Sequence, residues 1–374
     1  MIGSTDNKRV AIYVIYDEDG ILDTYRKNII NGLLSISDRL IVIVNGDINK
    51  ADLLYIFSIT ELVYIRDNVG YEMKAYEDLF LKYISPDFWK EFDELIMCND
   101  SFYGPFIPME DIFSEMKTSS ADYWGINMVC NGFVKYLSSY FIVYKSNIIK
   151  NNELINYFNA CKEYDISDFM QVVQLFEVGL FYYLRSRGYR SDSYIKGIAN
   201  NITKYPDYYL IKKNAPFMKR KSFCKDYNDV RTTRNALRYL NKNSDVSYIV
   251  ENAYRKYGYE NKCNEDGGIG NQEQEKVLMD SIKNKENEIV DFCIRNKDIY
   301  IYGAGRCARK VWAAYRHYMH QFRGFIISDN QTINDRVLWG FPVFYYSEIT
   351  EHIAFILAIK NQNAVKIKEG DVFI

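Results

Sequence analysis

The residues with the clearest chemical potential are Asn99-Asp100-Ser101, which end an apolar run at residues 95–98. Gly104 and Pro105 then prevent a strand from continuing, so we expect a buried strand that delivers a carboxylate to its carboxyl end. In open α/β sheets ligands bind at that end, where the loops after the strands diverge. The alternative is a polar turn in which Asp100 or Ser101 caps the following helix.

Three further segments share the pattern of an apolar strand followed by a polar loop. The four strands are expected at residues 9–16, 40–44, 62–65 and 95–98, and helical periodicity marks residues 21–37 and 71–83. Strands that are separated by helices form a parallel sheet, in which the loops after the strands share one edge. The sequence thus predicts an α/β fold with one crevice, lined by Asp17, Asn45, Asp47, Asn68 and Asp100.

Composition narrows the classes of function. The chain has 374 residues, 48% of them hydrophobic, and a net charge of −2, so no strong field attracts nucleic acid. It has no P-loop motif, no CxxC pair, and no apolar segment of signal-peptide or membrane-spanning type, so we expect a cytoplasmic protein. All 3 histidines lie near the C-terminus, which leaves carboxylates as the candidate general bases elsewhere.

Several motifs occur together and in order along the chain. They lie at residues 10–20, 65–76, 99–105, 122–126, 138–142, 177–180, 188–189 and 216–223. These segments resemble the rhamnan synthesis F family of bacterial glycosyltransferases. The resemblance implies a GT-A fold and transfer of rhamnose or another hexose from a nucleotide-diphosphate sugar. The acceptor would be a cell-surface polysaccharide or a lipid-linked glycan, reached by peripheral contact with the inner face of the membrane.

The same resemblance assigns the donor side of the site. Asn68, Gly70 and Ala75 match a pattern that packs beside the donor nucleotide, and Asn99-Asp100-Ser101 takes the place of a metal-binding Asp-x-Asp motif. Asp100 would then hold Mg²⁺ or Mn²⁺, although a hard cation shared with phosphates prefers more than one carboxylate. The predicted donor-binding residues are Tyr16, Asp17, Asn45, Arg66, Asn68, Gly70, Asn99, Asp100 and Ser101.

Glu177 falls on the base position that the resemblance implies for an inverting enzyme. Such a carboxylate removes the proton of the acceptor hydroxyl while that oxygen attacks the anomeric carbon. The alternative is a solvated glutamate near a helix N-terminus, where the helix dipole favours negative charge.

A basic cluster, Lys219-Arg220-Lys221, lies in an otherwise nearly neutral chain. These side chains could grip the donor diphosphate, rest on anionic lipid headgroups, or form a solvated basic helix face. Among the many aromatic residues, Trp124, Tyr136 and Tyr140 are candidates for stacking on sugar rings, with core packing as the alternative.

The C-terminal part has a second nucleotide-binding pattern. A strand leads into Gly303-Ala304-Gly305 and a helix, and a second strand ends at Asp329, as in Rossmann-like domains. We therefore expect a GT-A domain (1–225), a helical segment with a flexible linker (226–275, with the linker at 255–275) and a small Rossmann-like domain (276–374). The last would bind one nucleotide moiety or serve in docking or homodimer formation. The alternative function is a nucleotide-binding regulatory or scaffolding module beside a degenerate transferase domain.

Overall fold

The chain forms two compact units. The computed structural model describes residues 7–374 except 133, 165, 167, 225–229, 260–274, 334, 360–366, 369 and the side chains of 275–283. Unit 1 comprises residues 1–129, 137–162 and 189–275, and unit 2 comprises residues 130–136, 163–188 and 276–374. The domain boundaries that the sequence predicts near residues 225 and 275 remain a prediction.

The centre of unit 1 is a mostly parallel sheet with the strand order β3-β2-β1-β4-β8-β6, and β9 pairs with β6. The first four of these strands are parallel to one another, whereas β8 is antiparallel to both of its neighbours. All four predicted strands are present, so the predicted α/β fold is confirmed. The bounds are β1 (Arg9–Tyr16), β2 (Arg39–Asn45), β3 (Val63–Arg66), β4 (Glu94–Asn99), β6 (Tyr123–Asn131), β8 (Phe141–Lys145) and β9 (Ser191–Ile198).

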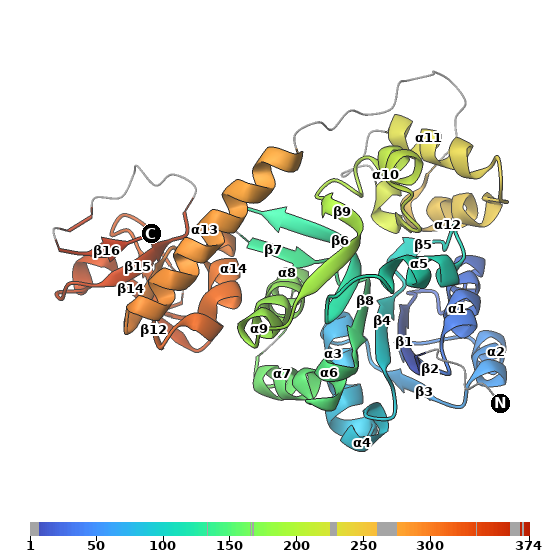
Figure 1. Cartoon of the computed structure of the whole chain (residues 1–374), viewed down its shortest axis with the longest axis horizontal. Helices are drawn as coiled ribbons and strands as arrows, with labels where there is room; N and C mark the ends of the chain where they lie inside the picture. Colours follow the sequence, from blue (N-terminus) through green and yellow to red (C-terminus); the bar gives the residue numbers. More distant parts are fainter. Residues whose placement is uncertain are drawn as a thin grey trace. The chain divides into compact units, whose positions relative to one another are not determined.

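Helices cover both faces of this sheet. Residues 10–15 of β1 are all buried, as is typical of a parallel strand that is covered on both sides. Figure 1 shows α1 and α2 on one side of β1 and β2, and α3 on the other. The helices are α1 (Thr24–Ile36), α2 (Lys50–Ile59), α3 (Tyr71–Asp78), α4 (Pro86–Trp89), α5 (Met109–Met116), α6 (Ser146–Lys150), α7 (Glu153–Cys161), α10 (Pro206–Lys213), α11 (Val230–Leu240), α12 (Ser247–Tyr257), the π-helix η1 (Leu79–Tyr83) and the 3-10 helix η3 (Arg220–Phe223).

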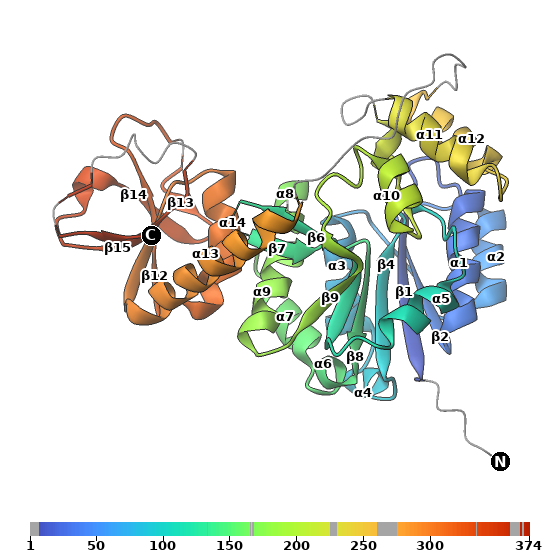
Figure 2. The same ribbon diagram turned by 45° about the horizontal axis from the view of Figure 1, so that its top comes forward.

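The helices near the end of unit 1 gather at one end of the sheet. Figure 2 shows α10, α11 and α12 beyond the end of the sheet at which β1 ends. At the same end, β5 (Phe102–Tyr103) pairs antiparallel with β10 (Met218–Lys219). The loops after the parallel strands are therefore flanked by segments from the later part of the chain.

The helix α1 begins later than its apolar pattern predicted. The pattern placed a helix at 21–37, but Ile21 and Leu22 precede the N-cap Asp23, and the Leu22 amide donates to Asp52 Oδ2 at 2.9 Å. Within the helix, Tyr25, Ile29 and Leu33 recur at helical spacing and are fully buried. Arg26 is buried on the same element, which places a charge inside the unit.

The sugar-stacking interpretation of three aromatic residues is wrong, and the alternative of core packing is confirmed. Trp124 and Tyr140 are only 1% and 2% exposed, and Tyr136 is also buried, so none offers a face for a sugar ring. Trp124 packs on Phe113, and Tyr140 packs on Phe102.

The predicted linker at 255–275 begins too early. Residues 255–257 form the last turn of α12, while residues 260–274 lie outside the described residues. The side chains of Arg255 and Lys256 are of types common in linkers, but both form ion pairs within the fold.

Unit 2 contains a second sheet, with the order β13-β14-β12-β11-β15-β16. Its strands are parallel except for the β13–β14 pair. The predicted strand–glycine turn–helix pattern is confirmed by β11, Gly303 to Gly305 and α14. The elements are α8 (Phe169–Val172), the π-helix η2 (Val173–Gly179), α9 (Leu180–Ser186), α13 (Glu275–Arg295), β11 (Asp298–Tyr302), α14 (Arg306–Tyr315), β12 (Gln321–Ile327), β13 (Val337–Leu338), β14 (Phe341–Tyr345), β15 (Ala354–Leu357) and β16 (Val372–Phe373).

A buried ion cluster joins α13 to the rest of unit 2. The Glu286 side chain has no exposed surface, and its Oε1 accepts from the Tyr182 hydroxyl at 2.5 Å. Its Oε2 accepts from Lys135 Nζ and from Arg185 Nη1, both at 2.9 Å. One carboxylate therefore serves three donors from other segments of the unit.

Replacing Glu286 with glutamine is expected to destabilise the protein by about 3–5 kcal/mol, because two partly buried cations lose the counter-charge of a fully buried carboxylate. The neighbouring variant Glu288→Gln is the matched control. Glu288 is 58% exposed and pairs only with Lys285 among the described residues, so its loss should cost under ~1 kcal/mol. Urea unfolding at pH 7 measures both, and equal losses would contradict the proposed role of the cluster.

Candidate active site

The predicted donor residues lie in a row at the carboxyl ends of the parallel strands. Tyr16 is paired with Asn45, and Asn45 with Arg66, so the last residues of β1, β2 and β3 are in register. On the other side of β1, Asn99 at the end of β4 lies beside Val14. The sheet thus brings residues from four separate parts of the sequence to one edge, as the sequence predicted for the crevice.

Arg66 organises the β2 and β3 side of this edge. Its guanidinium donates to Asn45 Oδ1 at 2.9 Å, to Asp78 Oδ2 at 3.0 Å and to the Val69 carbonyl at 2.9 Å. Gly70 follows in the left-handed region, with φ of 73°, and is the N-cap of α3. A Cβ there would lie 2.2 Å from Lys74 Cγ, so the turn requires glycine.

Neighbouring predicted residues differ in exposure. Asn45 is buried, whereas Tyr16 is 44% exposed and Asn68 is also exposed. At this edge Tyr16 and Asn68 are therefore open to solvent, whereas Asn45 is covered.

Asp100 is held by arginine side chains. Its Oδ2 accepts from Arg26 Nε at 2.7 Å and lies 2.6 Å from Arg26 Nη2 and 3.5 Å from Arg220 Nη1. Arg220 Nη1 also donates to the Asp100 carbonyl at 3.1 Å. Asp100 keeps 14% of its side-chain surface exposed, whereas Arg26 keeps 1%. The carboxylate is therefore at the surface of the edge, and its main counter-charge is inside.

Asp17 is the second acid of the edge, and it too is paired with cations. Its Oδ2 lies 3.2 Å from Arg26 Nη1 and 3.0 Å from Arg255 Nη2, and Lys256 Nζ lies 3.3 Å from the same oxygen. Burial acts to raise the pKa of Asp17, but the hydrogen bond from Arg255 and the charge of Arg26 outweigh it. The pKa is held well below its usual value, so Asp17 is ionised at neutral pH.

The basic cluster at 219–221 lies partly against the Asn99-Asp100-Ser101 loop. Lys219 Nζ donates to Ser101 Oγ at 2.8 Å and lies 3.9 Å from the centre of the Tyr140 ring. The Arg220 amide donates to the Ser101 carbonyl at 3.0 Å. Lys221 is exposed. The structure therefore brings Lys219 and Arg220, which were predicted as diphosphate or lipid contacts, directly to the predicted donor loop.

Sequence reasoning missed four charged residues of this edge. Asp23 accepts from Arg26 at 2.8 Å and from Arg255 at 2.6 Å, and Arg255 also pairs with Asp19. Lys256 pairs with Glu18 at 2.9 Å and with Asp19 at 3.0 Å. An arginine within the apolar stripe of α1 was the one local signal that could have drawn attention to Arg26. The residues missed are Asp23, Arg26, Arg255 and Lys256.

Glu177 lies in unit 2, within the π-helix η2. The other residues of that helix are all buried, and Glu177 alone is partly exposed. Its charge contributes to raising the pKa of Tyr136, after burial, and opposes the effect by which burial lowers the pKa of Lys310. π-Helical turns occur frequently at functional sites. The base role of Glu177 remains a prediction.

The glycine loop of unit 2 has a packing explanation. Gly303 has φ of 121°, and a Cβ there would lie 3.0 Å from the Ala358 carbonyl oxygen, so this close approach requires glycine. Gly305 is the N-cap of α14 and has open space around it. Asp329 accepts from the Ser347 amide at 3.0 Å and from its hydroxyl at 2.5 Å. Nucleotide binding by this loop remains a prediction.

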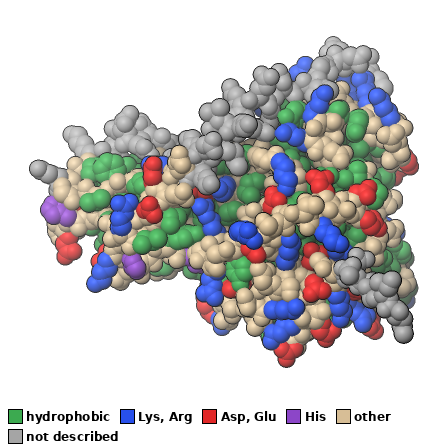
Figure 3. Space-filling view, in the orientation of Figure 1, with side chains coloured by type: hydrophobic (Ala, Val, Ile, Leu, Met, Phe, Trp, Pro, Cys, Tyr) green, Lys and Arg blue, Asp and Glu red, His purple; other side chains and the backbone are tan. Residues whose placement is uncertain are grey.

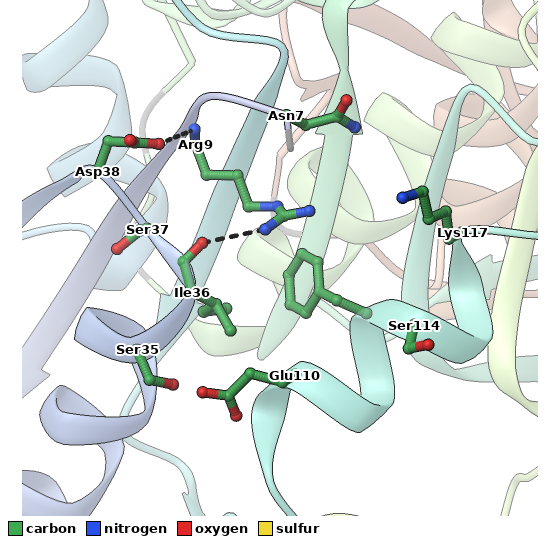
Figure 4. Close-up of a pocket in the computed structure, with 10 residues that line it drawn as sticks. Asn7, Arg9, Ser35, Ile36, Ser37, Asp38, Glu110, Ser114 and Lys117 are labelled. Atoms are coloured by element: carbon green, nitrogen blue, oxygen red, sulfur yellow. Dashed lines mark hydrogen bonds between the residues drawn. The ribbon is translucent and has the colours of Figure 1, made fainter. Parts of the chain in front are cut away.

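A pocket of about 540 Å³ lies at the other end of the unit 1 sheet. Figure 4 shows Arg9, Asp38, Glu110 and Lys117 around it, with the Arg9 amide donating to Asp38. We call the carboxyl ends of β1 to β4, with the loops that follow them, the donor edge. Arg9 begins β1, whose eight residues extend ~25 Å to this edge at ~3.3 Å per residue. This pocket is therefore separate from the predicted donor site.

Charges of both signs are mixed on one face of the molecule. On the face seen in Figure 3, acidic and basic side chains are interspersed among polar ones. Within the described part of the chain, no helix combines the length and apolar character needed to cross a bilayer.

Comparison with protein families identifies the chain. The family model described as Rhamnan synthesis protein F matches residues 40–289, well over half of the sequence. The chain belongs to this family. The resemblance is thereby confirmed for the motifs between residues 65 and 223, whereas the motif at residues 10–20 lies outside the matched range. The rhamnan synthesis F match includes β3, β4, Asp100, Glu177 and the basic cluster.

Individual relatives of this rhamnan synthesis F member are distant. The virulence protein VirA of Vibrio anguillarum is 25% identical over 189 residues, which are 50% of this chain and 59% of the relative. The chain thus spans less than two thirds of the length of the curated relatives that it matches.

Similar solved structures align over part of the chain at low scores. Glucosyl-3-phosphoglycerate synthase from Mycobacterium tuberculosis, solved with Mn²⁺, UDP-glucose and phosphoglyceric acid, is 11% identical, covers 38% of this chain and 58% of its own, and has a TM-score of 0.24. The mannosyltransferase Ktr4p from S. cerevisiae is 10% identical, covers 48% and 62%, and has a TM-score of 0.23. Such scores carry no argument about function.

Proposed function

We propose that this rhamnan synthesis F protein is an inverting glycosyltransferase that uses a nucleotide-diphosphate sugar. The observation that carries the proposal is the convergence of predicted donor residues at the carboxyl edge of β1 to β4. Tyr16, Asn45 and Arg66 are in register there, and Asn99 lies on the next strand. Ligands of open α/β sheets bind at this edge.

The reaction that we propose moves one sugar and one proton. An acceptor hydroxyl oxygen forms a bond with the anomeric carbon, and the bond between that carbon and the phosphate oxygen breaks. The electron pair of the broken bond stays with the nucleoside diphosphate, and the hydroxyl proton passes to a carboxylate. We assign this base role to Glu177, from its place in the family motif and its partial exposure within a buried π-helix.

The finer features of the proposal are the donor sugar and the acceptor. We propose rhamnose or another hexose as the sugar and a cell-surface polysaccharide or lipid-linked glycan as the acceptor. This rests on the family, which is that of a rhamnan synthesis protein. Peripheral contact with a membrane would follow from a lipid-linked acceptor.

A screen of nucleotide sugars tests the proposal. Purified protein is incubated with UDP-, GDP- and dTDP-hexoses, including dTDP-rhamnose, and release of the nucleoside diphosphate is measured with and without glycan acceptors. We expect slow hydrolysis of one donor class and faster release when an acceptor is present. If no nucleotide sugar is turned over while Gly305→Val abolishes binding of a nucleotide, the regulatory-module alternative is favoured instead.

A further inference from the structure

We propose that the donor edge neutralises the diphosphate with the side chains of Arg220 and Lys219, and that Asp100 is the positioning residue for Arg220 rather than a metal ligand. This inference rests on the proposed function, because it specifies how the same edge handles the donor's charge. It reverses the role that an Asp-x-Asp position implies for Asp100.

The oxygen atoms of the donor loop do not fit a divalent cation. Ser101 Oγ accepts from Lys219 Nζ at 2.8 Å, and Asn99 Oδ1 accepts from the Ser101 amide at 3.1 Å. Asp100 Oδ2 is bonded to Arg26. Magnesium at nucleotide sites is held by one or two carboxylates that are free to bind it, together with substrate phosphates and waters. A cation here would have a single carboxylate that is already shared with guanidinium groups.

No other group of acids at this edge makes up for that shortage. Asp17 lies close by, but Arg26, Arg255 and Lys256 surround its carboxylate. Within the ranges that the structure describes, no three His, Cys, Asp or Glu side chains form a group that could hold a metal ion. Positive charge at this edge therefore comes from the protein's own side chains.

Arg26 and Arg220 both contact Asp100 but differ in exposure. Arg26 is 1% exposed and also donates from Nη2 to the Tyr16 carbonyl at 2.6 Å, so it cannot turn toward a ligand. Arg220 is 12% exposed, and its cation lies 5.1 Å from the Tyr25 ring centre. Arg26 is thus the fixed anchor of Asp100, and Arg220 is the outer cation that Asp100 orients.

The donor groups of Arg220 are only partly used. Its Nη1 binds Asp100 and its side chain also forms a hydrogen bond with Tyr103, whereas its buried Nε has no hydrogen-bond partner among the described residues. Buried donors without a partner are rare, and each calls for an explanation such as a ligand. Arginine matches the paired oxygens of phosphate groups with parallel N–H bonds. A diphosphate at this edge would use those donors and would lie beside the Lys219 ammonium.

The same arrangement suits the departure of the nucleotide. When the bond to the sugar breaks, negative charge grows on the terminal phosphate oxygen, and preorganised cations stabilise such charge most effectively. Asp100 and Tyr25 fix the position of Arg220 before the donor arrives. Orienting Arg220 requires one carboxylate, at the middle position of the loop. Asn99-Asp100-Ser101 has its single carboxylate there.

Calorimetric titration of the full chain with UDP, dTDP and GDP tests this inference without an activity assay. The affinity of the best of these should change less than about threefold between EDTA and 5 mM Mn²⁺, where ~3-fold is small beside the effect of a lost charged bond. Arg220→Gln should weaken it about 10–100-fold, and Arg220→Lys should lose less. The control Arg39→Gln, at an exposed arginine where β2 begins, should leave the affinity unchanged.

A double variant separates positioning from a general structural effect. If Asp100 acts through Arg220, Asp100→Asn combined with Arg220→Gln should bind no more weakly than Arg220→Gln alone, since the two changes share one interaction. Independent losses that multiply would contradict the proposal. Thermal unfolding confirms that each variant is folded before it is titrated.

Metal binding by Asp100 would give a different pattern of nucleotide affinities. Binding that disappears in EDTA, returns with Mn²⁺, and loses this metal dependence in Asp100→Asn would make Asp100 a metal ligand. That outcome overturns this inference and leaves the glycosyltransferase proposal standing. Absence of binding by all three nucleotides, with and without Mn²⁺, would overturn both.

Discussion

Replacing Glu177 with glutamine is expected to lower kcat for sugar transfer by about 10²–10⁴-fold, the usual contribution of a general base. Glutamine keeps the size of the side chain but cannot accept the acceptor's proton. The helix η2 should keep its conformation, because its packing comes from Val173, Leu175 and Val178, which stay buried. The loss is therefore expected in the chemical step.

Two measurements on the Glu177→Gln variant distinguish catalysis from structure. Steady-state kinetics with donor and acceptor gives kcat, and calorimetry gives the affinity for the donor nucleotide, which we expect to change less than about twofold. Glu163→Gln is the matched control, since Glu163 is an exposed glutamate of the same unit. A variant at position 177 that keeps more than half of the normal kcat would remove Glu177 from the mechanism.

The sequence predicted the parallel sheet because its signals are local. Residues 9–16 are predicted and observed as the same strand, and the other three strands differ by one residue at either end. Continuous apolar runs that end in polar loops are a strong signal for buried parallel strands. The meeting of the loops at one edge followed directly, because parallel strands place the loops after them on the same edge.

The same sequence patterns did not predict the type of helix or which aromatic side chains are buried. Residues 79–83 and 173–179 are π-helical, although their apolar spacing reads as ordinary helix. Trp124 and Tyr140 are residue types that suit a sugar platform equally well, and only the packing of Phe113 and Phe102 on them decides that they are core. Residue type alone does not fix which face of a strand is covered.

The ion network of the donor edge was not predictable because its partners are distant in sequence. Arg26 is 74 residues from Asp100, and Arg255 is 238 residues from Asp17. The charges of α12 look like those of a solvated linker until the Asp17 loop is folded against them. Such pairs form because the topology places α12 beyond the end of β1 (Figure 2). No motif within either segment indicates them.

Replacing Arg26 with methionine is expected to destabilise the protein by about 3–5 kcal/mol at pH 7, because three carboxylates lose their most buried counter-charge. Arg26 is 1% exposed and bonds with Asp17, Asp23 and Asp100 together. Methionine fills a similar volume without charge, so the loss reports on electrostatics more than on packing. Lysine at this position should lose less, because it keeps the charge but not the fork of N–H groups.

The destabilisation should shrink in acid, and the sign follows from Asp17. Its pKa is held below the ordinary value by Arg255 and Arg26, so its ionised form stabilises the folded chain above the unfolded pKa of about 3.9. That stabilisation is lost as the pH falls through the lower folded pKa. In the Arg26→Met variant this stabilisation is smaller from the start, so acid removes less of it. The difference in free energy of unfolding between the two proteins is therefore largest at pH 7 and declines progressively below about pH 4.

Urea unfolding of both proteins from pH 7 to pH 3 measures this trend. Arg39→Met is the control, since Arg39 is exposed and its loss should change the stability by less than ~0.5 kcal/mol at every pH. A constant difference between wild type and Arg26→Met across the whole range would mean that the loss comes from packing. A difference that declines in acid would show that Arg26 matters as the counter-charge of the donor-edge carboxylates, which is the role on which the positioning of Asp100 depends.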